Sequence, residues 1–281
     1  MSTFTFLGTG SCEGIPAPFC SCELCNFARK HGGKDQRRRF SVLVDNDLVV
    51  DFGPDAAQAF RQFNIDDTKI KYICFTHSHC DHFCPMDLRW RAGLDTVLPM
   101  IIAGNANIKE GYVKEIAWEF RNNPANCRNN AEIIEAVPGK RFAMGEYGIL
   151  PIKASHIKEG ECALNYQITT PAGKKLLILA DTGWWSDESF ELVRGEMADV
   201  VISELSCGIH PGEDVKRDFH MGAKAVFDFI EKLKAQRSVK PEARCYTAHI
   251  SHVPKVTQQG YEEYFTGSCV TPGYDGLTVE F

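Results

Sequence analysis

The amino-acid sequence predicts an α/β sandwich in which β-sheets pack together and helices cover them on the outside. Three observations indicate this class: short β-rich runs recur along the whole chain, helical patterns lie between some of them, and strand runs occur both early and late. The chain has 281 residues, of which 44% are hydrophobic and 24% charged. These values are typical of a globular protein, and we expect one domain over residues 1–281.

The elements follow from hydrophobic periodicity. The expected strands are Thr3–Leu7, Val42–Val44, Leu48–Asp51, Tyr72–Phe75, Met100–Ala103, Ile149–Ala154, Asn165–Thr169, Leu176–Ala180, Val200–Ser203 and Leu277–Phe281. The expected helices are Ala56–Phe63, Ile108–Arg121, Asp187–Arg194 and Met221–Leu233. In the last helix, Ala225, Phe229 and Leu233 recur every four residues and predict an apolar stripe that faces the core. The stretch Asn122–Asn130 predicts an exposed loop.

Charge and cysteine content restrict the partners and the compartment. The chain carries 31 Lys and Arg against 37 Asp and Glu, a net charge of −6, which gives no general attraction for nucleic acid or anionic membranes. The stretch Met1–Leu7 has no basic region, and no apolar run approaches membrane-spanning length. We therefore expect a cytoplasmic protein. In that compartment its twelve cysteines indicate thiols and metal ligands rather than disulfides.

A cluster of histidines directly follows the strand run Tyr72–Phe75. It contains His77, His79, Asp81 and His82. In extended backbone, His77 and His79 point to the same side, and a turn after them would present Asp81 and His82 to a neighbouring position. Imidazole and carboxylate together favour zinc, manganese or iron over calcium. The alternative is a polar loop that happens to carry histidines.

Three further candidates follow other strand runs. His156 comes after Ile149–Ala154, Asp181 after Leu176–Ala180, and His249 after the run 245–248. Each alone could be an ordinary turn residue or N-cap. Together they favour a metal site, because active sites form on loops at strand ends over a rigid scaffold.

These residues carry a family resemblance. The pattern His77-x-His79-x-Asp81-His82, followed by His156, Asp181 and His249, resembles the metallo-β-lactamase superfamily of hydrolases, and Asp51-Phe52-Gly53 is similar to its Asp-x-Gly turn. The resemblance implies an αββα sandwich, in which two mixed β-sheets pack together with helices outside, and a dinuclear site. It implies that one metal ion is held by His77, His79 and His156, the other by Asp81, His82 and His249, and that Asp181 bridges the two.

A second constellation lies near the N-terminus. Cys20, Cys22 and Cys25 are too crowded for mutual disulfides but suit one thiolate-rich metal ion. Zinc normally takes a fourth ligand, for which His252 is the candidate, three residues after His249. We expect a structural zinc that ties a loop at about 12–40 to the loop carrying His249. The alternative is a set of reduced surface cysteines.

The resemblance extends over nearly the whole chain to the PhnP family, the phosphoribosyl 1,2-cyclic phosphate phosphodiesterases of phosphonate breakdown. The matching motifs are Leu7-Gly8-Thr9-Gly10, Gly14-Ile15-Pro16, the cysteine loop, Leu88-Arg89-Trp90, His249-Ile250-Ser251-His252 and Asp275-Gly276. Cys80 and Cys84, which flank the metal motif, depart from the pattern. The resemblance implies hydrolysis of a small phosphorylated sugar, 5-phosphoribosyl 1,2-cyclic phosphate, to ribose 1,5-bisphosphate.

The expected mechanism uses two divalent ions, Mn or Zn, which hold a hydroxide between them and stabilise charge on the phosphoryl group. Asp81 is counted among the catalytic residues as well as the ligands. His220 matches by position a histidine that the family uses as general acid. Arg89 and Arg91 are candidates for binding the substrate's own phosphate, or else they are surface arginines on a turn. His31 and His210 receive no role.

Two other functions stay open at this point. One is an RNA-processing phosphodiesterase of the same superfamily, which the acidic balance and the lack of a basic arm disfavour. The other is a non-hydrolytic protein of cofactor biosynthesis resembling PqqB, which the seven candidate ligands disfavour. The sequence leaves the physiological metal and a homodimer open.

Overall fold

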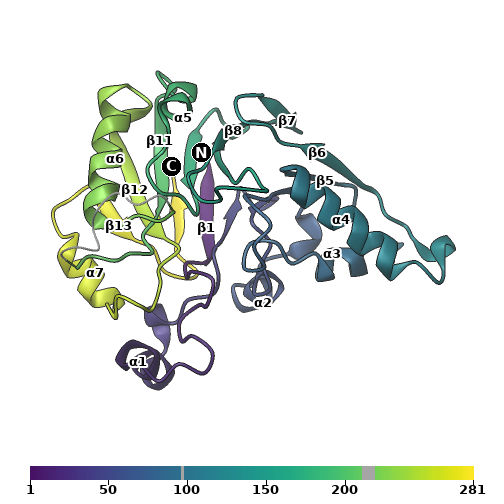
Figure 1. The fold of residues 1–281 in the computed structure, drawn as a ribbon, viewed down its shortest axis with the longest axis horizontal. Helices are drawn as coiled ribbons and strands as arrows, with labels where there is room; N and C mark the ends of the chain where they lie inside the picture. The colour runs from purple at the N-terminus through teal and green to yellow at the C-terminus, as the bar shows by residue number, and fades with distance from the viewer. Residues whose placement is uncertain (96–97, 211–218) are drawn as a thin grey trace.

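The computed structural model describes residues 1–95, 98–210 and 219–281. These residues form two seven-stranded β-sheets that pack face to face (Figure 1). The order of the first sheet is β14 (Thr278–Glu280), β1 (Thr3–Gly8), β2 (Ser41–Val44), β3 (Leu48–Val50), β4 (Tyr72–Cys74), β5 (Met100–Gly104) and β6 (Ala131–Glu135). The order of the second is β13 (Val270–Pro272), β12 (Val239–Ala248), β11 (Ala198–Glu204), β10 (Lys175–Leu179), β9 (Leu164–Thr169), β8 (Tyr147–Lys153) and β7 (Phe142–Met144).

Both sheets are mixed, as the sequence predicts. In the first sheet, β14, β1, β2 and β3 pair antiparallel, whereas β3, β4, β5 and β6 run parallel. The second sheet is divided in the same way, antiparallel from β7 to β10 and parallel from β10 to β13. The carboxyl ends of parallel strands lie at one edge of each sheet, which places the following loops side by side.

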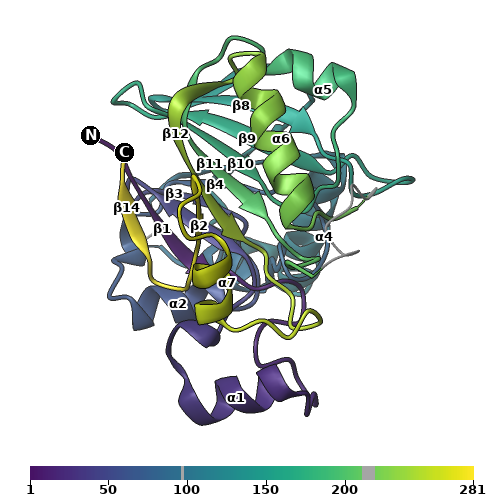
Figure 2. The ribbon, with the colours of Figure 1, turned by 90° about the vertical axis from the view of Figure 1, so that its left-hand side faces the viewer.

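Helices cover the outer face of each sheet (Figure 2). The first sheet packs against α2 (Ala56–Gln62), α3 (Met86–Arg91) and α4 (Ala106–Glu119), and the second against α5 (Asp187–Leu192), α6 (Ala223–Ala235) and α7 (Gln258–Tyr264). Helix α1 (Glu23–His31) projects from the rest of the chain in both views. Short 3₁₀ turns occur at Gly33–Asp35, Asp67–Lys69 and Pro124–Asn126. Among the described residues, no helix has the length and apolar character needed to cross a membrane.

The hydrophobic core forms three layers. Phe4, Tyr166 and Ile178 belong to the layer between the two sheets. The outer layers join each sheet to its helices, with Phe60 in one and Phe229 in the other. Burying apolar surface on both faces of a sheet explains why its central strands are nearly continuous hydrophobic runs.

The predicted helices are present with shifted ends. Helix α4 begins at Ala106 rather than at Ile108, because the side chain of Asn105 accepts a hydrogen bond from the backbone N–H of Ile108 and caps the helix there. Helix α6 begins after Gly222, which is extended and serves as N-cap. Its predicted apolar stripe is confirmed, since Ala225, Phe229 and Leu233 are all buried.

Several elements are not anticipated by the sequence pattern: α1, α3, α7, β6, β7 and β13. These elements are short or lie at the edge of a sheet. Strand β6 carries exposed Glu132 and Glu135 and lacks a continuous apolar run, so pairing with β5 rather than residue type makes it a strand.

Candidate metal centre

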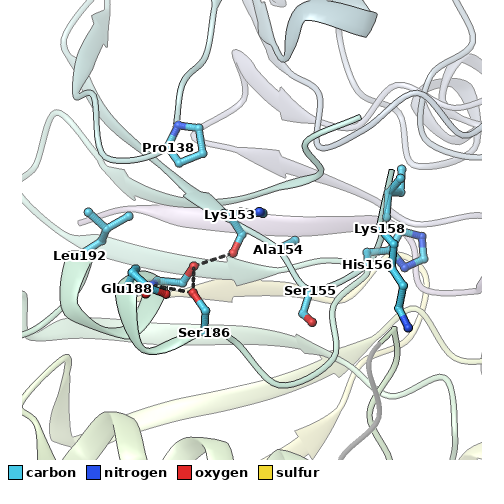
Figure 3. Close-up of a pocket in the computed structure, with 11 residues that line it drawn as sticks. Pro138, Lys153, Ala154, Ser155, His156, Lys158, Ser186, Glu188 and Leu192 are labelled. Atoms are coloured by element: carbon cyan, nitrogen blue, oxygen red, sulfur yellow. Dashed lines mark hydrogen bonds between the residues drawn. The ribbon is translucent and has the colours of Figure 1, made fainter. Parts of the chain in front are cut away.

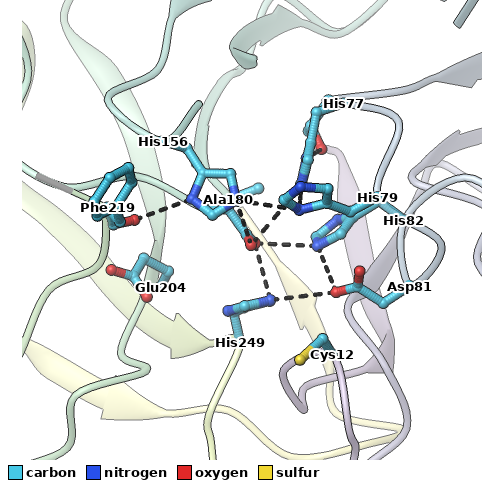
Figure 4. Close-up of polar contacts among 12 residues, drawn as sticks. Cys12, His77, His79, Asp81, His82, His156, Ala180, Glu204, Phe219 and His249 are labelled. Atoms are coloured by element: carbon cyan, nitrogen blue, oxygen red, sulfur yellow. Dashed lines mark hydrogen bonds and ion pairs between the residues drawn. The ribbon is translucent and has the colours of Figure 1, made fainter. Parts of the chain in front are cut away.

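The loops after β4, β8 and β10 bring the first predicted ligand group together. The Nε2 atom of His77 lies 2.9 Å from Nδ1 of His79, and Nε2 of His156 lies 3.3 Å from the same atom (Figure 4). Asp181 directs Oδ2 toward this group, 3.4 Å from Nε2 of His156 and 3.9 Å from Nε2 of His77. Three imidazoles and one carboxylate oxygen therefore converge on one point.

The second group lies on the other side of Asp181. Its Oδ1 atom is 3.1 Å from Nε2 of His82 and 2.9 Å from Nε2 of His249. Asp81 completes this group, with Oδ2 3.0 Å from Nε2 of His82 and 3.8 Å from Nε2 of His249. The two oxygens of Asp181 thus face different groups, which is the geometry of a bridging carboxylate.

The donor set fits divalent cations. The ligand atoms of each group lie within 4.8 Å of one another. Four of them are buried and find no hydrogen-bond partner among the described residues: Asp81 Oδ2, His82 Nε2, Asp181 Oδ1 and His249 Nε2. Buried polar atoms that converge without hydrogen bonds require another partner, and a cation coordinated by imidazole and carboxylate supplies it.

Electrostatics couple the members of the cluster. Burial raises the pKa of Asp181, but the adjacent His249 and His82 outweigh burial and hold that pKa well below its usual value. Burial lowers the pKa of His249, but the charge of Asp181 and the close approach of the Asp181 and Asp81 carboxylates raise it to about 10. Because the imidazoles must lose protons to coordinate a metal, metal affinity at this cluster depends on pH.

Asp51 supports both ligand groups from behind. One of its oxygens accepts a hydrogen bond from the backbone N–H of Thr76 at 2.7 Å, and the other lies 2.7 Å from Nδ1 of His82. The Thr76 hydroxyl also donates to Asp51 at 2.9 Å and lies 3.0 Å from Nδ1 of His77. Asp51 therefore fixes the ring orientation of a ligand in the second group and, through Thr76, of one in the first.

The Asp-x-Gly turn has a steric reason. Asp51 has φ +61°, a left-handed conformation that residues with a side chain seldom adopt. A Cβ atom on Gly53 would lie 1.9 Å from the carbonyl oxygen of Asp81, so only glycine allows the turn to approach the metal motif this closely. Strained backbone of this kind is typical of functional sites, and His249, at φ +50°, is a second example.

Glu204 and Ser206 are functional candidates that the sequence reasoning missed. Glu204 ends β11 and is buried. The Ser206 hydroxyl donates to Glu204 Oε2 at 2.6 Å and lies 2.8 Å from Nδ1 of His249, and the backbone N–H of Met221 donates to the other carboxylate oxygen. A carboxylate directly after Val200–Ser203 was the available signal, since the other candidates also follow strand runs.

His220 enters the same network. Its Nδ1 atom lies 3.3 Å from Glu204 Oε2, and its ring lies 5.0 Å from that of His156, between centroids. Burial lowers the pKa of His220, but the hydrogen bond and charge of Glu204 outweigh burial and raise it. The imidazole is 30% exposed and lines the cleft beside the metal centre, so it can exchange a proton with a bound molecule.

The predicted cysteine site is assembled as well. The Sγ atoms of Cys20 and Cys22 each lie 3.6 Å from Nδ1 of His252, and Cys25 completes the group. All twelve cysteines lie in the described part of the chain and are free. Burial raises the pKa of the Cys22 thiol, but hydrogen bonds, that of His252 foremost, lower it to about 6. Three sulfurs and one imidazole within 4.8 Å of one another fit tetrahedral zinc.

A cleft of about 630 Å³ opens over the metal centre. Its described walls include Glu13, His210, His220 and Ser251 and contain no lysine or arginine. A second pocket of about 660 Å³ shares His156 with this cleft (Figure 3). That pocket contains Lys153 and Lys158. Ser189 also lines it, and its hydroxyl donates to the carbonyl of Lys153 at 2.9 Å.

The structure does not bring the predicted substrate-binding arginines to the cleft. Arg89 on α3 forms ion pairs with Glu115 at 2.5 Å and Glu119 at 3.2 Å on α4. Arg91 donates to Asn130 at 2.8 Å and to the carbonyl of Leu98. Arg89 therefore joins α3 to α4, and Arg91 joins α3 to the segments before β5 and β6. Neither arginine lines the cleft over the metal centre.

Comparison with known proteins places this geometry in context. Residues 46–240 match the family model of the beta-lactamase superfamily domain. Among solved structures, a new diphosphatase from the PhnP family superposes with a TM-score of 0.75 at 22% identity, covering 100% of this chain and 97% of that one. Zn²⁺-bound PqqB from Methylobacterium extorquens gives 0.74 at 16% identity, covering 99% and 100%. The short form of human tRNase Z gives 0.65 at 17% identity, covering 99% and 98%.

One curated sequence, an octanoyltransferase from Porphyromonas gingivalis, is 25% identical over 158 residues. The match covers 53% of this chain and 30% of that protein, so the chain spans less than a third of the length of this relative.

Proposed function

The chain belongs to the beta-lactamase superfamily and is a metallo-β-lactamase-fold hydrolase, and we propose that it is a phosphodiesterase that hydrolyses a small cyclic phosphodiester. The proposed reaction converts 5-phosphoribosyl 1,2-cyclic phosphate to ribose 1,5-bisphosphate. The observation that carries the proposal is the position of Asp181 between two ligand groups, with His220 among the residues that line the same cleft. This arrangement pairs two cation sites with one proton donor.

The fold implies divalent metal ions, which we propose to be two, Mn or Zn. His77, His79 and His156 would hold one, Asp81, His82 and His249 the other, with Asp181 between them. Bound there, the cations supply Lewis acidity and lower the pKa of water. Asp51 and Ser206 keep His82 and His249 in the orientation that presents Nε2 to the site.

The leaving group of a cyclic ribose phosphate is a sugar alkoxide, which departs poorly unless it is protonated. We propose that His220 supplies that proton. Its Nδ1 atom contacts Glu204, which leaves Nε2 as the ring atom that can serve the cleft. Glu204 also favours the protonated imidazole by raising its pKa over the opposing effect of burial.

The charge on the walls favours a small substrate over RNA. The described walls of the cleft carry Glu13 and no lysine or arginine, whereas binding of a polynucleotide backbone depends on several basic side chains. A second anionic group on the substrate would reach Lys153 and Lys158 in the pocket that shares His156 with the cleft. These lysines replace Arg89 and Arg91 as candidates for that contact.

The test is turnover of four substrates by the purified metal-loaded protein. They are 5-phosphoribosyl 1,2-cyclic phosphate, the same cyclic phosphate without the 5-phosphate, a dinucleoside diphosphate and a precursor tRNA. We expect the first to have the highest kcat/KM and loss of the 5-phosphate to raise KM. The proposal would be overturned if the protein cleaved the precursor tRNA in preference to the cyclic phosphates. It would also be overturned if fully metal-loaded protein cleaved neither cyclic phosphate. The diphosphate arm tests the activity of the PhnP-family neighbour.

A further inference from the structure

Glu161 joins two loops that carry ligands of the first group. It lies between β8 and β9, five residues after His156 on the same loop. One carboxylate oxygen accepts from the backbone N–H of Ser78 at 2.8 Å, and the other accepts from the Ser78 hydroxyl at 2.5 Å. Ser78 lies between His77 and His79 in the sequence. The Glu161 carboxylate therefore binds the segment that carries these two ligands through two hydrogen bonds.

Asn105 is a further hydrogen-bond partner of Glu161. The side-chain amide of Asn105 donates at 2.6 Å to the Glu161 oxygen that also accepts from the backbone N–H of Ser78. It donates to the carbonyl of Cys162 at 2.9 Å as well. Asn105 is buried and caps α4, so it is held by the helix it begins. Glu161 thus connects the His156 loop and the His77–His79 segment to the rigid start of α4.

The alternation of side chains explains why serine suits position 78. In extended backbone, neighbouring side chains point to opposite sides. His77 and His79 point toward the metal centre, as Figure 4 shows, and Ser78 points away from it toward Glu161. The carboxylate itself belongs to neither ligand group.

We propose that Glu161 is the positioning residue of the first metal site, which sets the spacing of His77 and His79 relative to His156. Asp51 contacts the ring of His82 directly, whereas Glu161 holds the segments that carry the ligands through Ser78 and Asn105. Neither acts through coordination. The inference rests on the proposed metal centre but is independent of the identity of the substrate.

The experiment titrates Co²⁺ into metal-free protein and follows absorption of the bound ion. Charge-transfer bands of thiolate ligands report the cysteine site, and ligand-field bands report the His/Asp cluster. Glu161→Ala removes all three hydrogen bonds, and we expect a loss of about 10–100-fold in affinity at one of the two His/Asp sites. Glu161→Gln can keep all three, since its amide oxygen accepts from Ser78 N–H and Asn105 while its amide nitrogen donates to the Ser78 hydroxyl. Its affinity should stay near that of the parent.

The matched control is Glu159→Ala, which removes an exposed carboxylate from the same loop and should bind Co²⁺ like the parent. Equal affinity of the Glu161→Ala and Glu159→Ala variants would overturn the proposal. A Glu161→Gln variant that binds Co²⁺ as weakly as Glu161→Ala would also overturn it, because the charge of Glu161 rather than its hydrogen bonds would then determine the affinity. Equal weakening of all sites, with a lower Tm of the metal-free protein, would show general unfolding and also overturn it. If the parent binds Co²⁺ and the variants differ as expected, but the parent hydrolyses none of the phosphodiesters, only the proposed function would be refuted.

Discussion

The rings of His220 and His249 are stacked, with centroids 5.6 Å apart and planes inclined by 13°. Both residues are held from Nδ1 by the same short network, His220 by Glu204 directly and His249 through Ser206. A candidate acid and a candidate metal ligand therefore share one buried carboxylate. Glu204 fixes the relative position of the two rings. Substitutions of His220 and of Glu204 can therefore test the role of this network.

Replacement of His220 should separate proton donation from metal binding. We expect His220→Ala to keep its metal content and to lose about 10²–10⁴ in turnover of the cyclic sugar phosphate. The loss should be much smaller for an activated aryl phosphodiester, because its phenolate leaves without a proton. Steady-state kinetics on both substrates, with elemental analysis of the same samples, measures this.

The control for this substitution is His31→Ala on α1, an exposed histidine, which should behave like the parent. Equal loss on both substrates with metal retained would mean that His220 positions the phosphate rather than donating a proton. A rise in KM with unchanged kcat would mean that it only binds substrate.

Glu204 should control the pH range of activity. Burial lowers the pKa of His220 but Glu204 outweighs burial and raises it. Because a general acid must be protonated, activity falls as pH rises through that pKa. Glu204→Gln removes the charge, lowers the pKa of His220, and should shift the descending limb of the kcat profile to lower pH. Glu132→Gln, which changes an exposed residue of β6, is the control. An unshifted descending limb in Glu204→Gln would contradict the assignment.

Cys22→Ser should affect stability more than chemistry. The thiol is a good zinc ligand because hydrogen bonds lower its pKa to about 6 against the opposing effect of burial. Structural zinc contributes folding free energy, and losing one thiolate weakens that contribution. We expect a lower Tm in calorimetry and retained turnover in the cold. Cys269→Ser, which removes an exposed thiol, should unfold at the parental temperature, and an unchanged Tm in Cys22→Ser would argue against a structural zinc.

Asp181→Asn should deplete both ions of the His/Asp cluster while sparing the cysteine site. Each oxygen of Asp181 faces one ligand group, and a neutral amide loses the bridging charge and one oxygen donor. Elemental analysis with anomalous scattering should find three metal ions in the parent, two at the cluster and one at the cysteines, and the cluster ions reduced in the variant. Asp67→Asn, at an exposed turn, should keep all three. A parent with a single ion at the cluster would contradict the dinuclear site.

Much of the fold and the site could be read from local pattern. Buried strands such as β10 are continuous apolar runs because both faces are covered, and this property is written in the residues themselves. The clustering of His77, His79, Asp81 and His82 is also local, since the four lie within six positions. The donor chemistry of these side chains therefore indicates a metal from the sequence alone.

The tertiary structure decided what depends on segments distant in sequence. It brings Glu204 into contact with His220 and Glu161 into contact with Ser78. The sequence could not predict these contacts, because the partners lie 16 and 83 positions apart and no periodicity links them. It also removed Arg89 and Arg91 from the cleft, since α3 packs against α4 and pairs Arg89 with Glu115. The sequence by itself determined which residues could bind metal. Only the packing of two sheets decided which of them meet and which side chains hold them in place, because strand ends converge only when both sheets are assembled.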